Sequence, residues 1–419
     1  MALLAQPESS SVVTRLLVTK GLRAFGDGFV SLLLPLYLLG LGFTPLQVGI
    51  LTTTTLLGSG LLTLLVGLYA YRCHYRTLLL AATILMALTG LGFAVATDFW
   101  PLLLVALVGT LNPSGGDVSV FLPLEHAVLA RVASDRRRTT VFARYSLVGS
   151  LVAALGSLAA GVPALATEVA GVPAQTAIQA MFLVYALLAA VSWWIYQGLP
   201  RAMSGDAHSP PAPLVQARKR VYTLAALFSL DAFGGGFVVQ SMVALWLYQT
   251  HGLSAASTGA LFFWTGVLTA FSYLVAARIA DRWGLVNTMV FTHLPSSLCL
   301  VAIPFAPSLS YVIALLLIRS ALSQMDVPTR SSYVMAIVPA AERPAAASVT
   351  SVPRSLASAV SPVLAGYLLA ASPFGWPFVI AGSVKIAYDL LLLGMFSKVR
   401  PPEESGRDGP TGSSIRPDR

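Results

Sequence analysis

The sequence predicts an all-α membrane protein in which twelve transmembrane helices form two pseudo-symmetric six-helix bundles. Hydrophobic residues make up 56% of the chain and charged residues only 10%, against about 25% charged residues in a typical soluble domain. Apolar runs of membrane-spanning length follow one another between short polar breaks. The heptapeptide AFGDGFV at Ala24–Val30 nearly recurs as AFGGGFV at Ala232–Val238, which indicates that a block of helices was duplicated.

The chain divides into four segments by composition. We expect residues 1–200 to form the first six-helix bundle and residues 221–398 the second. Residues 201–220 are rich in Pro, Ser and Ala and end in a basic cluster, which is typical of a cytosolic linker. Residues 399–419 carry Pro, Gly, Ser and mixed charge with almost nothing apolar, which predicts a disordered cytosolic tail.

Lys and Arg concentrate in every second break between spans. The breaks that follow odd-numbered spans contain neither residue, whereas those that follow even-numbered spans do, beginning with Arg72 and Arg76. By the positive-inside rule, these breaks and both termini face the cytosol. The net charge of +9 reflects this asymmetry and does not indicate nucleic-acid binding. We expect a multi-pass protein of the plasma membrane, such as the inner membrane of a bacterium.

The duplication extends well beyond the heptapeptide. Leu41–Gly49 matches His251–Gly259, and Ala127–Gly161 matches Ser332–Gly366 without a gap. Both copies begin on the cytosolic side, so the halves are parallel repeats about an axis along the membrane normal. In transporters built this way the solute binds near the midplane, between the two halves.

A break in the second half carries a recognisable motif. Residues 277–284, ARIADRWG, resemble the G-x-x-x-D-R-x-G pattern that follows the second span of each half in the major facilitator superfamily. The first-half copy, residues 67–74, departs from it with Tyr71 and His74. The resemblance covers nearly the whole chain and implies a secondary transporter working by alternating access. It also implies that Asp281 and Arg282 form a cytosolic latch.

A second stretch resembles a signature of drug exporters in that superfamily. Ser358–Gly366 reads SAVSPVLAG on the eleventh span, with small residues around a proline. The alternative is that these small residues let helices pack closely.

Ionisable residues inside the spans are the strongest pointers to a site, because each costs about 2.5 to 3.5 kcal/mol on insertion scales. Arg23 and Asp27 lie one turn apart on the first span, and Asp231 lies opposite Arg23 in the repeat. The resemblance implies that the first and seventh spans line the central cavity. We hypothesise a polar network of these three residues across the halves. The alternative is that Arg23 and Asp27 neutralise each other within one helix.

The fourth and tenth spans contain Pro, Gly and charged residues that predict discontinuous helices beside a polar cavity. The candidates for solute binding and proton coupling are Arg23, Asp27, Asp117, Asp231, Arg319, Gln324 and Asp326. Glu125, Arg144 and Arg330 are alternatively gate residues at the cytosolic mouth. Lys385 and Asp389 are spaced for a local structural pair on the last span.

We expect a secondary active transporter that exports a small organic solute, coupled to protons. A carboxylate in an apolar cavity changes its proton affinity as access alternates, and Asp27 and Asp117 are the first choices. The alternatives are an uptake symporter, a uniporter, or a receptor or scaffold that does not transport. The sequence lacks Gly-Lys, H-E-x-x-H and G-x-S-x-G patterns, so we expect no enzyme activity, cofactor or metal. The expected partners are the solute, protons and the bilayer, and we expect a monomer.

Overall fold

The computed structural model describes residues 6–69, 73–114, 119–132, 135–200, 215, 217–339 and 342–396. These residues form helices joined by short turns. Ten of the helices are long and apolar enough to cross a membrane, and two shorter apolar helices lie in the fourth and tenth spans. This arrangement confirms the predicted all-α membrane fold with two repeated sets of six spans.

The described residues of the first half form eight helices, some of which share one span. They are α1 (Gln6–Gly40), α2 (Pro45–Tyr69), α3 (Tyr75–Val95), α4 (Phe99–Val108), α5 (Phe121–Val132), α6 (Asp135–Ala159), α7 (Val162–Ala170) and α8 (Ala174–Gln197). The fourth span is broken between α4 and α5, as the sequence predicts, because Asn112 and Pro113 interrupt the helical pattern.

Among the described residues, the second half forms another eight helices and includes the 3-10 turn η2. They are α9 (Arg218–Gly236), α10 (Gln240–His251), α11 (Ala255–Trp283), α12 (Leu285–Ala302), η2 (Ile303–Phe305), α13 (Leu309–Leu322), α14 (Asp326–Ile337), α15 (Arg343–Ala371) and α16 (Trp376–Phe396). The tenth span is broken between α13 and α14, as predicted. The seventh span is also broken, between α9 and α10, where three successive glycines weaken the helix.

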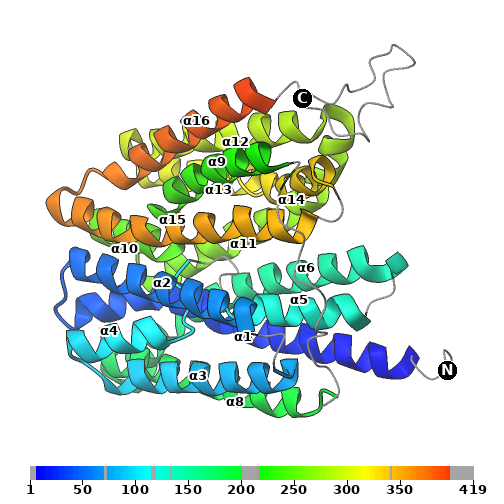
Figure 1. Cartoon of the computed structure of the whole chain (residues 1–419). Helices are drawn as coiled ribbons and strands as arrows, with labels where there is room; N and C mark the ends of the chain where they lie inside the picture. The colour runs from blue at the N-terminus through cyan, green and yellow to red at the C-terminus, as the bar shows by residue number, and fades with distance from the viewer. Residues whose placement is uncertain are drawn as a thin grey trace, which may run out of the picture.

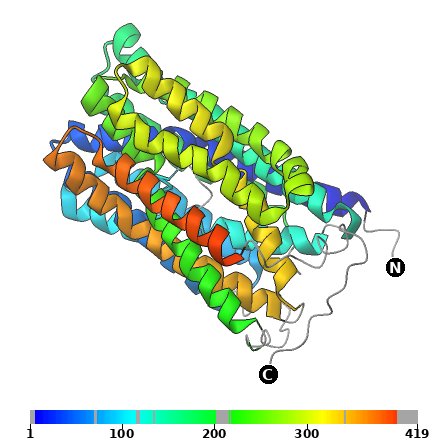
Figure 2. The same ribbon diagram turned by 90° about the horizontal axis from the view of Figure 1, so that it is seen from above.

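The two sets of helices lie side by side (Figure 1). We call the end that holds the starts of α1 and α9 the terminal end, and the end that holds the turn from α1 to α2 the far end. Figure 2 shows the long helices running roughly along one common direction. The predicted boundaries of the linker and the predicted disordered tail fall largely outside the described residues, so these remain predictions.

The most extensive contacts between the halves are made by α2 on α15 and by α6 on α11, and α1 also packs on α10. A Cβ on Gly49 of α2 would lie 2.5 Å from the carbonyl oxygen of Pro362, and one on Gly366 would lie 2.9 Å from the Cα of Gly49. The hydroxyl of Thr53 accepts a hydrogen bond from the backbone N–H of Val363 at 2.9 Å. Small residues therefore bring the backbones of the two halves together in the part of the molecule nearer the far end.

Candidate functional site

A buried ion pair ties α1 to α5 in the first half. The Arg23 guanidinium donates to both carboxylate oxygens of Glu125, with an Nη1–Oε1 distance of 3.0 Å. Tyr196 of α8 donates to the same carboxylate at 2.6 Å, and Tyr145 of α6 donates to it as well. Thr19 donates at 3.2 Å. Since neither charged side chain is more than 5% exposed, the pair is stable only because its charges and hydrogen bonds are satisfied.

A second buried cluster ties α9 to α14 and α16 in the other half. Asp231 of α9 accepts a hydrogen bond from Arg330 of α14 at 3.2 Å and one from Lys385 of α16 at 2.6 Å. Arg330 also pairs with Asp326, one turn earlier on its own helix. All four side chains are at most 10% exposed. Asp231 is therefore the centre of a network that joins three helices.

His293 of α12 extends this cluster. Its Nδ1 lies 3.0 Å from both carboxylate oxygens of Asp389 on α16. Its Nε2 lies 3.5 Å from the Oδ1 of Asp231 and 3.4 Å from the Nζ of Lys385. Lys385 contacts that same Oδ1, so the imidazole and the ammonium group lie beside the same carboxylate oxygen.

The two ion pairs occupy equivalent places in the repeat with opposite polarity. Aligning the heptapeptides places Arg23 opposite Asp231. The gapless match that begins at Ala127, continued back by two residues, places Glu125 opposite Arg330. The Arg–Glu pair of one half thus corresponds to the Asp–Arg pair of the other.

The buried contacts of Arg23 and Asp231 described above lie within their own halves, whereas the predicted network joined these residues across the halves. The contacts described above join Arg23 to Glu125 and Tyr196, and Asp231 to Arg330 and Lys385, each within its own half. Glu125 and Arg330, which we also considered as gates, are buried partners in these pairs. Asp27 is half-buried near Tyr185.

The remaining candidates are distributed over both halves. Arg319 on α13 is partly buried, and its Nε has no hydrogen-bond partner among the described residues. Gln324 lies in the break between α13 and α14, also partly buried. Arg144 and Arg282 are exposed. Asp117 and the side chain of Asp281 lie outside the described residues, so the latch and one coupling candidate remain predictions.

Lys385 and Asp389 were interpreted from their spacing as a local pair, and this interpretation is wrong. Lys385 reaches Asp231 on another helix, and Asp389 pairs with His293. Sequence reasoning also overlooked His293 and the two tyrosines, Tyr145 and Tyr196. An available signal was that a histidine and a lysine stood within apolar spans, where ionisable groups are costly.

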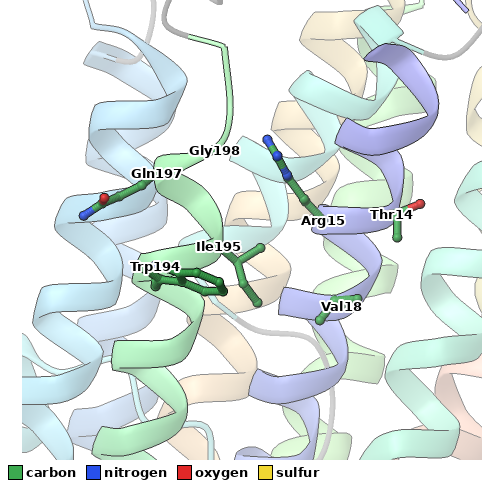
Figure 3. A pocket seen from close by; sticks show the side chains of 7 residues that line it. All are labelled: Thr14, Arg15, Val18, Trp194, Ile195, Gln197 and Gly198. Atoms are coloured by element: carbon green, nitrogen blue, oxygen red, sulfur yellow. The ribbon is translucent and has the colours of Figure 1, made fainter. Parts of the chain in front are cut away.

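A depression of about 520 Å³ lies on the surface of the first half near the terminal end (Figure 3). Arg15 and Val18 of α1 face Trp194 and Ile195 of α8 across it. Both helices belong to the same half, and none of the buried ion pairs lines it. We therefore do not place the solute there.

Two repeated halves of six spans define a polytopic membrane protein with the architecture of many secondary transporters. The sequence pattern of the Major Facilitator Superfamily matches residues 16–320 and 224–417. The chain belongs to this superfamily, which confirms the predicted family. It is accordingly a transporter of a small-molecule solute and not an enzyme.

Similar proteins support the same fold. The uncharacterized membrane protein YJR124C of Saccharomyces cerevisiae is 26% identical in an alignment that covers 90% of this chain and 92% of that protein. The nucleoside transporter NupG aligns with a TM-score of 0.69 at 13% identity, covering 92% of this chain and 99% of NupG. The human organic anion transporter MFSD10 aligns with a TM-score of 0.64 at 19% identity, covering 92% of this chain and 100% of MFSD10.

Proposed function

We propose that this protein is a proton-coupled secondary transporter that exports a small organic solute by alternating access. The two six-helix halves, residues 1–200 and 221–398, act as the moving units. Nucleosides and organic anions, named for two similar structures, are both small organic solutes. We further propose that the protein lies in the plasma membrane with both termini in the cytosol, which follows from the distribution of Lys and Arg.

The observation that carries proton coupling is the arrangement around Oδ1 of Asp231. When His293 is neutral, its Nδ1–H donates to Asp389 and its Nε2 accepts from Lys385, which remains bound to Asp231. When His293 is protonated, its Nε2–H becomes a donor directed at Asp231, and the ammonium group of Lys385 is repelled. Proton binding therefore changes which cation holds Asp231.

Asp231 connects this exchange to the broken helices. Its second oxygen accepts a hydrogen bond from Arg330, which follows the break in the tenth span, and Asp231 itself precedes the break in the seventh. Breaks in helices provide places where backbone angles change while the flanking segments stay rigid. A proton at His293 can thus bias the positions of α9 and α14, and Asp231 and Asp326 are the coupling carboxylates that we favour.

Export is the direction supported by the exporter-like stretch Ser358–Gly366. In the structure this stretch forms the close contact between α15 and α2. Small residues there allow the halves to close at the far end, and separation of the same contact would open it. Uptake by the same fold, or binding without transport, remains the competing reading and is decided by measuring flux.

The test uses purified protein in liposomes that contain a pH-sensitive dye. Efflux of uridine, xylose and fluorescein is measured with and without a pH gradient. We expect the gradient to drive efflux of at least one solute, and His293→Gln to abolish the proton-driven component. His74→Gln, an exposed histidine at the start of α3, is the matched control and should behave like the wild type.

Three outcomes contradict the proposal in different ways. Flux that is insensitive to the pH gradient indicates a uniporter. Flux in which the solute moves in the same direction as the protons indicates an uptake symporter. No flux for a broad panel of solutes, by protein shown to be folded, indicates a receptor or scaffold.

A further inference from the structure

Arg354 is an exposed arginine within a membrane-spanning helix. It lies on α15, about 12 Å along the helix axis from the start of the apolar span at Ala346. Among the described residues it has no hydrogen-bond or ion-pair partner. A cation at this depth requires a compensating negative charge or access to water.

The side of α15 that carries Arg354 faces α9, a helix of the same half. Helical spacing places Arg354 on the same face as Ser358 and Ser361. Ser361 donates a hydrogen bond to the carbonyl oxygen of Phe233 on α9 at 2.6 Å, and the backbone of Ser358 abuts Gly236 of the same helix. Arg354 therefore lies along the seam between α15 and α9, and not on the face of α15 that holds the exposed Leu364 and Tyr367.

The carboxylates near Arg354 are already paired. Arg354 interacts electrostatically with Asp231 and Asp326, but both are engaged by Arg330, and Asp231 also binds Lys385. The largest electrostatic influence on Arg354 is the like charge of Arg330. Arg330 and Lys385 already balance these two carboxylates, so neither carboxylate is free to pair with Arg354.

The first half also has a basic side chain at the position equivalent to Arg354, but this side chain comes from a different helix. Arg354 corresponds to Gly149 of α6 in the gapless match. The side chain of Lys20 from α1 lies over that glycine, since a Cβ on Gly149 would be 2.5 Å from the Lys20 Cε. Each half thus presents one basic side chain at this place in the fold, although the two come from different helices.

We propose that Arg354 binds the negatively charged group of the transported solute, and that the solute is a small organic anion. This inference rests on the proposed transport function. A carboxylate, sulfonate or phosphate group accepts two parallel N–H bonds from a guanidinium, which an exposed arginine without a partner among the described residues can supply. The charge of the Arg354 guanidinium attracts such an anion and repels organic cations. The headgroup of an anionic lipid offers the same chemistry, so the test separates the two sources.

Binding is measured on purified full-length protein with two probes of nearly equal shape, 2-naphthoate and its neutral amide. Thermal unfolding in detergent gives the Kd of each probe from its stabilising effect. We expect 2-naphthoate to bind more tightly than the amide, and Arg354→Gln to raise the Kd of 2-naphthoate about tenfold or more while leaving the amide unchanged. Arg354→Lys should retain part of the preference. Lys219→Gln, an exposed cation on α9, is the matched control and should leave it intact.

Equal binding of the two probes, or an Arg354→Gln variant that keeps the preference, overturns the anion site. A lipid arm repeats the measurement in nanodiscs of phosphatidylglycerol and of phosphatidylcholine. If phosphatidylglycerol abolishes the binding of 2-naphthoate at all concentrations, the site belongs to lipid and the inference is wrong. If the protein binds 2-naphthoate through Arg354 but shows no flux, the anion site stands and the transport function is wrong. If the protein transports only neutral solutes, the transport function stands and the anion site is wrong.

Discussion

The buried pair of Arg23 and Glu125 provides a quantitative test of the described site. Glu125 has no exposed surface, and Glu125→Gln leaves Arg23 buried without a countercharge while the tyrosine hydroxyls retain an oxygen acceptor. Breaking a buried ion pair by removing one partner costs about 3 to 5 kcal/mol. Arg23→Gln leaves the opposite charge unpaired and should cost a similar amount. The double variant buries neither charge, so it should be destabilised by less than the sum of the single changes, with a coupling energy of about 2 kcal/mol or more.

The assay is reversible unfolding of the purified protein by titration with dodecyl sulfate, followed by circular dichroism. Arg144→Gln, which removes an exposed arginine, is the control and should change the free energy of unfolding by about 0.5 kcal/mol or less. If the double variant loses the sum of the two single losses to within about 0.5 kcal/mol, Arg23 and Glu125 do not act as a pair. The described geometry would then be wrong at this site.

Further predictions concern packing and coupling. Gly28→Ala should destabilise the fold by about 1 to 3 kcal/mol in the same unfolding titration, because its Cβ would overlap the carbonyl oxygen of Ala153. Gly60→Ala is the control and should be neutral or stabilising, because the space around Gly60 is open. Gly49→Leu should abolish flux in liposomes while the protein still folds, since it prevents α2 and α15 from closing at the far end; Gly394→Leu, also in open space, should transport normally. Lys385→Gln should abolish proton-driven flux, because it removes the ammonium group that shares Asp231 with His293. An unchanged proton dependence would refute this role of Lys385.

Much of the fold is encoded in hydropathy and local composition. The number of spans, the duplication and the breaks in the fourth and tenth spans follow from apolar length and from the positions of Pro and Gly. The break in the seventh span was not predicted. The first copy of the heptapeptide remains helical with Asp27 in its centre, while the second breaks just after Gly236, because each added glycine weakens a helix by about 1 kcal/mol relative to alanine.

The pairing of the buried charges was less predictable. The position of a charge within an apolar span identifies Arg23 and Asp231 as candidates from the sequence alone. Their partners are far away in the chain: Glu125 lies 102 residues from Arg23, and Lys385 lies 154 residues from Asp231. Spacing along one helix reveals neighbours on that helix and says nothing of how the helix is rotated toward the others. For this reason the spacing of Lys385 and Asp389 favoured a local pair, whereas tertiary packing directs the two side chains to Asp231 and His293.

The opposite polarity of the two equivalent ion pairs also distinguishes the halves from each other during assembly. The halves share a fold and much of their small-residue packing, so α1 and α9 present similar surfaces to their neighbours. If α1 were to dock in the place of α9, Arg23 would meet Arg330, and the converse exchange would bring Asp231 to Glu125. Both mistakes bury like charges against each other, which the membrane interior strongly disfavours. The charge inversion between the duplicated halves therefore favours docking of α1 and α9 each in its own bundle.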